Sequence, residues 1–326
     1  MKVKIDSNVY YLPENKETNE DLVLDNPHWD MSKIAEKTGI FTRSIASVRQ
    51  TAVDLAFEAG SILLRDSVHI DDVDLLVLVT QSPDYVLPTS ACILQDRLGL
   101  FKKYMAFDVN LGCSGFVYAL SIVGSLIESG IGKKGLILCS DTYSKYIDKD
   151  DRTCRPIFSD GASATLLVPS DINSLGPFVL GTDGRGYDKL IVREGGARDP
   201  HITSKSRHGR LEMHGADVFL FTLNTVPACI KELLEKSKLG VDDIDLFVFH
   251  QASQLVLENI IRATSLDEDK VFINLKNTGN TVSASIPVAL KDAETQGRLI
   301  KGDRIMLVGF GVGLSHGATI MTWTGS

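Results

Sequence analysis

The 326-residue sequence has few features of secreted, metal-binding or membrane-spanning proteins. It contains five cysteines, an odd number, and none of the paired spacings that are typical of disulfide frameworks or zinc sites. We therefore expect a reducing, cytoplasmic setting and no metal site. No apolar run reaches the roughly 18 residues of a membrane span. The polar N-terminus is also unlike a signal peptide, so we expect no membrane association.

The sequence also lacks a long basic run. The formal net charge is -8, which argues against a nucleic-acid partner. Any anionic ligand would therefore have to bind at a local basic patch. Hydrophobic residues make up 44% of the chain and charged residues 23%, so the chain is able to bury a substantial core. Its length fits one large domain or two of ordinary size.

Three pairs of similar segments recur along the chain in the same order. They are residues 70–78 with 241–249, residues 117–120 with 287–290, and residues 136–138 with 305–307. The offsets stay between 169 and 171 residues, which indicates two similar halves, residues 1–170 and 171–326. Each half alternates short β-branched runs with amphipathic helices, such as 51–64 and 219–239. This alternation predicts an α/β fold with largely parallel, buried strands, whose equivalent ends meet at one central site.

One cysteine, Cys113, lies where a predicted buried strand, residues 104–109, meets a hydrophobic helix that opens at Ser114. The first turn of a helix leaves N–H groups unpaired and carries the positive end of the helix dipole. We therefore expect a nucleophilic thiol with a lowered pKa. Gly112 and Gly115 allow a substrate carbonyl to approach the backbone closely. The alternative is a buried structural cysteine.

His250 ends the apolar strand Leu246–Phe249 and precedes a helical pattern that starts at Gln251. The dipole of that helix disfavours the imidazolium form. A neutral imidazole is able to donate one hydrogen bond without first losing a proton, as an electrophilic catalyst requires. The alternative is a structural histidine in a loop, whose ring only forms hydrogen bonds with its neighbours.

Asn280 lies in a turn-rich segment before a helix that opens at Ala284, and taken alone it is a turn or cap residue. A glycine-rich segment, residues 309–317, follows the predicted strand 304–308 and is expected to be a flexible loop. A dinucleotide-binding fingerprint requires a helix directly after its glycine segment, and the sequence predicts no helix here. A backbone N–H that stabilises an oxyanion is the better interpretation.

Five segments together resemble the thiolase superfamily and, within it, β-ketoacyl-acyl carrier protein synthase III. They are residues 108–115, 158–164, 249–252, 279–285 and 309–313, and the resemblance covers nearly the whole chain. Their agreement favours a nucleophilic Cys113 over a structural one. A thiolase would carry a second cysteine near the last glycine segment, and no cysteine follows Cys229. A synthase of the two-histidine type would have histidine where Asn280 stands.

The resemblance implies a thiolase-like fold, layered α-β-α-β-α, whose two halves are related by a pseudo-twofold axis. It implies that Cys113 takes an acyl group from a thioester, with the oxyanion held by N–H groups of Cys113 and of Gly311 or Val312. A malonyl thioester then places its carbonyl between His250 and Asn280, loses carbon dioxide, and attacks the acyl group. The substrates are thioesters of coenzyme A or acyl carrier protein, and no separate cofactor is needed.

Further positions follow from the resemblance. Arg152 matches a residue that stacks on the adenine of coenzyme A, whereas Lys33 replaces the tryptophan opposite, with Trp29 nearby. Residues that dock the carrier protein are replaced by Leu220 and Leu255. The expected acyl-binding residues are Leu87, which reaches across the interface of a homodimer, together with Met213, Phe219 and Phe310.

Two activities of this fold stay open at this point. One is a condensing enzyme of fatty-acid or specialised acyl-chain biosynthesis. The other is an acyltransferase that uses Cys113, His250 and Asn280 to form an ester or amide without decarboxylation. An inactive binding or scaffold protein is disfavoured because all three residues are intact.

Overall fold

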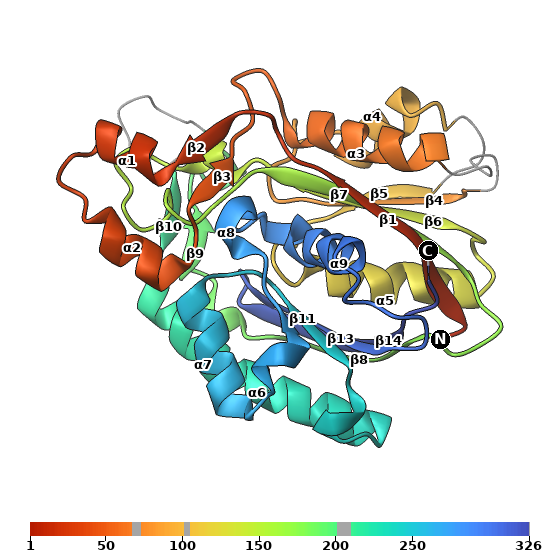
Figure 1. Cartoon of the computed structure of the whole chain (residues 1–326). Helices are drawn as coiled ribbons and strands as arrows, with labels where there is room; N and C mark the ends of the chain where they lie inside the picture. The colour runs from red at the N-terminus through yellow and green to blue at the C-terminus, as the bar shows by residue number, and fades with distance from the viewer. Residues whose placement is uncertain (67–72, 101–104, 201–209, 326) are drawn as a thin grey trace.

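The structure, a computed structural model, describes residues 1–66, 73–100, 105–200 and 210–325 (Figure 1). The strands are β1 (Val3–Tyr11), β2 (Lys16–Thr18), β3 (Thr42–Ser44), β4 (Leu75–Val79), β5 (Met105–Val109), β6 (Gly135–Asp141), β7 (Gly161–Pro169), β8 (Leu175–Thr182), β9 (Leu190–Val192), β10 (Leu211–Met213), β11 (Leu246–Phe249), β12 (Val271–Phe272), β13 (Arg304–Gly311) and β14 (Ser315–Thr322). The helices are α1 (Asn19–Asp25), α2 (Met31–Thr38), α3 (Ala52–Asp66), α4 (Ser90–Arg97), α5 (Gly115–Glu128), α6 (Gly215–Ser237), α7 (Gln254–Thr264), α8 (Leu275–Thr278) and α9 (Ser285–Thr295). The start of the first repeated segment, residues 70–72, and residue 104 lie outside the described residues.

Two five-stranded sheets share one strand order. The first runs β1-β7-β6-β4-β5, and the second, taken from the opposite edge, runs β8-β14-β13-β11-β12. The segments that match in the sequence lie in equivalent elements, namely β4 and β11, β6 and β13, and α5 and α9. We propose from this equivalence that residues 1–170 and 171–326 form the two halves.

The prediction of largely parallel strands is only partly correct. In the first sheet, β4 pairs in parallel with β5 and β6, whereas β7 runs antiparallel to β6 and β1. The second sheet repeats this mixture, because β14 runs antiparallel to β13 and β8. The reason is the connection: β13 returns directly into β14 through a tight hairpin, and no crossover helix intervenes.

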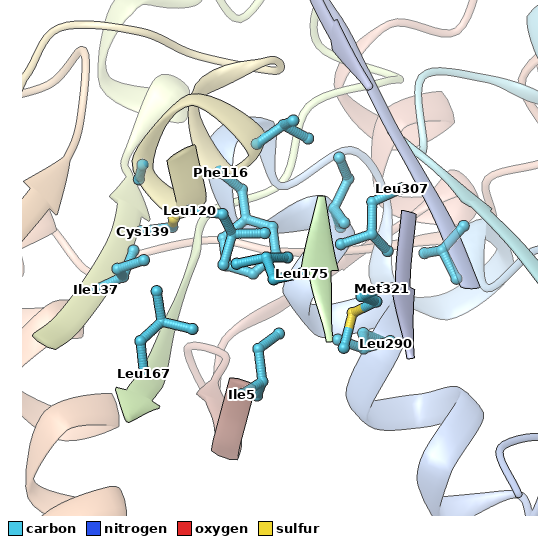
Figure 2. Packing of buried hydrophobic residues seen from close by; sticks show 14 of the residues in the cluster. Ile5, Phe116, Leu120, Ile137, Cys139, Leu167, Leu175, Leu290, Leu307 and Met321 are labelled. Carbon is cyan, nitrogen blue, oxygen red and sulfur yellow. The ribbon is translucent and has the colours of Figure 1, made fainter. Parts of the chain in front are cut away.

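Helices α5 and α9 lie between the two sheets and form the central layer (Figure 1). Figure 2 shows Phe116 and Leu120 of α5 in the core between Ile137 of the first sheet and Leu307 of the second. α5 has no charged residue before its last position, which suits a helix that is buried between two sheets. The outer layers are α3 with α4, against the first sheet, and α6 with α7, against the second. The order is therefore α-β-α-β-α, as expected from the sequence.

Two local predictions were wrong. The strand before the nucleophile was expected to be buried, but β5 is the edge strand of its sheet and Met105 is 42% exposed. The glycine segment 309–317 was expected to be a flexible loop, but it forms the end of β13, a tight turn and the start of β14. Glycines suit this hairpin because neighbouring backbone approaches it closely: a Cβ on Gly309 would lie 2.7 Å from the carbonyl oxygen of Cys113.

Candidate active site

Cys113 lies in the turn that joins β5 to α5, and its side chain is buried. The Gly115 N–H donates to the carbonyl of Gly112, which closes the turn around the cysteine. A Cβ on Gly112 would lie 2.5 Å from Gln81 Oε1, and one on Gly115 would lie 2.4 Å from Val79 Cγ1. Besides any role in substrate approach, both glycines are therefore needed for packing, because neighbouring side chains leave no room for a Cβ.

The expected lowering of the Cys113 pKa is wrong for the unliganded protein. Burial raises the pKa of the thiol to about 12, the nearby carboxylate of Asp141 adds to this, and the N–H groups of Cys113 and Val312 oppose it. Helix α5 begins only at Gly115, after the N-cap Ser114, so the thiol lies outside the first turn. The free-energy cost of removing a thiolate from water is larger than the stabilisation that these N–H dipoles give it.

His250 follows β11 directly, and its backbone N–H donates to the carbonyl of Val308 at 2.8 Å. The ring is buried, with Nδ1 2.6 Å from Ser285 Oγ, and it lies nearly perpendicular to the ring of Phe310. Burial lowers the pKa of His250 to about 3, so the imidazole is neutral at physiological pH. The neutral form was expected, but its cause is burial and not the dipole of α7, which begins at Gln254.

Asn280 is held by backbone pairing with a segment from the other half of the chain. Its N–H donates to the carbonyl of Ile157, and its carbonyl accepts from the N–H of Ser159. The side-chain Oδ1 accepts from the Val282 N–H at 2.9 Å, which leaves Nδ2 directed towards His250 Nε2 at 3.4 Å. The two side chains thus present nitrogen atoms to the same space.

One cavity of about 370 Å³ brings these residues together. Its walls are mainly apolar and come from α6, α7 and the end of β13. The residues expected from the sequence that line it are Cys113, His250, Asn280, Met213, Phe219, Phe310 and Gly311. A cavity with few polar groups suits an apolar substrate that is oriented by a small number of hydrogen bonds.

The hairpin between β13 and β14 contains Gly311 and Val312, the residues expected to donate to an oxyanion. A Cβ on Gly311 would lie 2.9 Å from Cys113 Sγ, so the hairpin passes directly over the thiol. The N–H groups of Cys113 and Val312 both approach the sulfur. The geometry therefore favours Val312, and not Gly311, as the residue whose N–H is available beside that of Cys113.

Other residues singled out in the sequence lie away from this cavity. Arg152 lines a separate cleft, formed mostly by acidic residues and Arg210. Leu87 is 79% exposed on a loop and does not contact the cavity of its own chain. Trp29 is buried in a small cluster with Leu22, and therefore offers no free face for stacking.

Two leucines that replace expected docking residues lie at or near the cavity. Leu255 lines the cavity and is exposed, and Leu220 is exposed on α6 beside the lining residue Phe219. Lys33, on α2, is exposed and pairs with Asp30 at 2.9 Å.

A buried polar network behind the site was not foreseen. Asp141, at the end of β6, accepts hydrogen bonds from the Ser283 hydroxyl at 2.5 Å and from the Gln81 N–H at 2.8 Å. Burial raises the pKa of Asp141 to about 7, although these hydrogen bonds act in the opposite direction. The contact joins the segment after Asn280 to the first half of the chain. Its only sequence signal was an acidic residue at the end of a mainly apolar strand.

Outside residues 67–72, 101–104, 201–209 and 326, no group of three or more His, Cys, Asp or Glu side chains is placed to hold a metal ion. In the same part of the chain, no helix has both the length and the apolarity to cross a lipid bilayer.

The chain is similar over nearly its whole length to known proteins of one family. Residues 107–184 match the family model of 3-oxoacyl-[acyl-carrier-protein] synthase III, and residues 234–323 match the model of its C-terminal part. The chain is 37% identical over 325 residues to a β-ketoacyl-[acyl-carrier-protein] synthase III of Clostridium novyi, covering 98% of this chain and 99% of the relative. It is 38% identical over 322 residues to a protein of the same name from Fusobacterium nucleatum, covering 96% of each chain.

A solved structure shows the same similarity. A crystal structure of a 3-oxoacyl-(acyl-carrier-protein) synthase III superposes with a TM-score of 0.96 at 42% identity, covering 99% of this chain and 100% of the other. A likeness of this extent includes both sheets and all the segments that form the cavity.

Proposed function

Since the chain belongs to the β-ketoacyl-[acyl-carrier-protein] synthase III family, we propose that it is a condensing acyltransferase that uses Cys113, His250 and Asn280. The observation that carries these assignments is the convergence of the three residues on one mainly apolar cavity. The thiol comes from the first half of the chain, whereas the two nitrogen donors come from the second. We propose thioesters of coenzyme A or acyl carrier protein as the substrates.

In the first step, Cys113 Sγ attacks the carbonyl carbon of an acyl thioester. The carbonyl oxygen becomes negative and lies between the N–H groups of Cys113 and Val312, which hydrogen-bond to it as the charge develops. The bond to the departing sulfur breaks, and that thiol carries away the proton lost by Cys113. The product is an acyl-enzyme, which divides one difficult transfer into two easier ones.

In the second step, a malonyl thioester places its thioester carbonyl against the nitrogen atoms of His250 and Asn280, which lie 3.4 Å apart. Both groups are neutral donors, so they stabilise the enolate that forms when carbon dioxide leaves. The enolate carbon then attacks the acyl carbonyl, and the bond to Cys113 Sγ breaks. The sulfur of Cys113 leaves as a thiolate and takes a proton from the solvent, and the extended β-ketoacyl thioester departs.

We also propose that the enzyme acts as a homodimer. Strand β5 lies at the edge of its sheet, and the free side of such a strand is a template for pairing with a second copy. The nearby loop exposes Tyr85, Val86 and Leu87. Buried Thr89 Oγ1 and Ser90 Oγ have no hydrogen-bond partner among the described residues. A second copy on this face would cover the apolar side chains and supply partners to these atoms.

Two measurements test the proposed function. The protein is incubated with a panel of acyl thioesters of coenzyme A and of acyl carrier protein, and intact-mass spectrometry detects the acyl-enzyme. Release of labelled carbon dioxide from malonyl thioesters then reports the second step. We expect both signals in the wild type and no acyl mass in Cys113→Ala, whereas Cys229→Ala, a buried cysteine of α6, should still be acylated.

The outcomes separate the two activities that the sequence leaves open. Acylation without release of carbon dioxide from any malonyl thioester, but with formation of esters or amides, would support the non-decarboxylating acyltransferase. Absence of any acyl-enzyme would overturn both assignments.

A further inference from the structure

We propose that Ser285 is a positioning residue that holds His250 in the tautomer with its hydrogen on Nε2. This inference rests on the proposed function, because only that tautomer is able to donate a hydrogen bond from Nε2 to a thioester carbonyl or enolate. Ser285 is the first residue of α9, and its side chain is buried. It does not line the cavity and would act through His250.

The hydrogen bonds of the Ser285 hydroxyl determine the direction of its own hydrogen. The backbone N–H of Gln251 donates to Ser285 Oγ at 3.4 Å, so one lone pair of the oxygen is used as an acceptor. The other contact of the hydroxyl is His250 Nδ1, at 2.6 Å. Among the described residues no carbonyl or carboxylate accepts from Ser285 Oγ, so its hydrogen is directed to Nδ1.

This direction decides the tautomer. A neutral imidazole carries one hydrogen, and a ring nitrogen that accepts a hydrogen bond does not carry it. Since Nδ1 accepts from Ser285, the hydrogen lies on Nε2, the nitrogen 3.4 Å from Asn280 Nδ2. The burial that lowers the pKa of His250 to about 3 keeps the ring from gaining a second hydrogen.

Asn280 is oriented in a corresponding way. The Val282 N–H donates to Asn280 Oδ1 at 2.9 Å, so the amide cannot turn its oxygen towards His250 without losing this bond. A separate hydrogen bond therefore fixes the orientation of each donor. The Val282 N–H orients the Asn280 amide, and the Ser285 hydroxyl orients the His250 imidazole. Two donors held face to face have no good contact with each other, and they become satisfied when an acceptor oxygen lies between them.

The first test uses the unliganded protein and needs no substrate. Long-range ¹H–¹⁵N NMR spectra at neutral pH distinguish a protonated ring nitrogen from an unprotonated one, and the signals of His250 are assigned by their loss in His250→Gln. We expect the hydrogen on Nε2 in the wild type, and a loss of this strict preference in Ser285→Ala. A wild-type ring with its hydrogen on Nδ1 would overturn the inference, whatever the reaction of the enzyme.

The second test uses the two half-reactions. We expect Ser285→Ala to reduce kcat for carbon dioxide release roughly tenfold, about the effect of one lost hydrogen bond between neutral groups, with acylation of Cys113 unchanged. Ser285→Thr keeps the hydroxyl and should recover most of the rate. Ser174→Ala is the control, because Ser174 is an equally buried serine whose hydroxyl donates to the Val3 carbonyl, remote from the cavity.

Failure of this inference and failure of the proposed function are distinguishable. If the wild type releases no carbon dioxide from any malonyl thioester, the proposed function fails while the NMR experiment still decides the tautomer. If Ser285→Ala slows acylation and decarboxylation equally, with the tautomer unchanged, Ser285 is a structural residue only and the inference is wrong.

Discussion

Gly309 of β13 lies against the backbone of Cys113, so closely that a Cβ at position 309 would be 2.7 Å from both the Cys113 carbonyl oxygen and Ser114 Cα. This contact brings the hairpin between β13 and β14 onto the turn that carries Cys113. The hydroxyls of Ser114 and Ser315, 2.8 Å apart, join the same two segments. The position of the thiol therefore depends on packing between the two halves.

Gly309→Ala should impair both folding and acylation. The atoms that a Cβ would meet belong to the backbone and cannot move aside as a flexible side chain can, so we expect a loss of about 1–3 kcal/mol or more in the free energy of unfolding. Gly184→Ala is the matched control, because a Cβ there has open space. Urea denaturation and intact-mass measurement of the acyl-enzyme check both effects. An acylation rate in Gly309→Ala equal to that of the wild type would contradict the close contact.

Reactivity of Cys113 should depend steeply on pH. Because burial raises the pKa of its thiol to about 12, little thiolate exists at neutral pH, and alkylation by iodoacetamide should accelerate about tenfold per pH unit from pH 7 to 10. The measurement uses Cys92→Ser, which removes the exposed cysteine, followed by peptide mapping. A rate that is already constant at neutral pH would show instead that the thiol is activated before substrate binds. Acyl groups from thioesters should map to Cys113 alone.

Asn280→Asp should separate the half-reactions. A carboxylate cannot donate to the enolate and repels its charge, so release of carbon dioxide should fall by at least about 100-fold, the effect of losing one oxyanion donor. Acylation of Cys113 should remain measurable. Asn259→Asp, on α7 and outside the cavity, controls for the added charge. Loss of acylation together with decarboxylation would indicate that Asn280 acts in both steps.

His250 should make the protein less stable in acid. Its pKa is lowered from 6.5 to about 3 in the folded state, so between these values the unfolded chain binds a proton that the folded protein does not. Stability is therefore lost as the pH falls through this window, by about 1.4 kcal/mol per unit. His250→Gln should flatten this dependence in urea denaturation between pH 7 and 4, whereas substitution of the exposed His28 should not. Parallel pH profiles for wild type and His250→Gln would rule out this contribution.

Leu87 should control the acyl-chain length accepted by the partner subunit of the proposed dimer. Leucine fills less volume than an aromatic residue, so the wild type should accept chains longer or more branched than acetyl. Leu87→Trp should shift kcat/KM towards short chains, by about 1–3 kcal/mol per excluded methylene at most. Leu24→Trp is the control, since Leu24 is equally exposed at 79% but lies on α1. A monomer by light scattering, or an unchanged chain-length profile in a folded dimer, would contradict the assignment.

Much of this organisation was predictable because it depends on local patterns. The repeated strand and helix segments predicted two similar α/β halves, and the two sheets do share one strand order. The flanking motifs singled out Cys113, His250 and Asn280, which the structure places around one cavity. Each of these residues follows a recognisable element or turn in the sequence, so its position at the end of that element follows from chain order alone.

What depends on contacts between distant residues was decided by the tertiary structure. The sequence placed Cys113 near a helix start and predicted a lowered pKa, whereas burial in the folded protein, with Asp141 nearby, raises it. The contact between Ser285 and His250 joins residues 35 positions apart. The free energy of a charge depends on the solvent and dipoles around it, and the direction of a hydrogen bond depends on every neighbouring donor and acceptor. Both quantities exist only once the two halves have packed together, and for this reason local sequence patterns did not contain them.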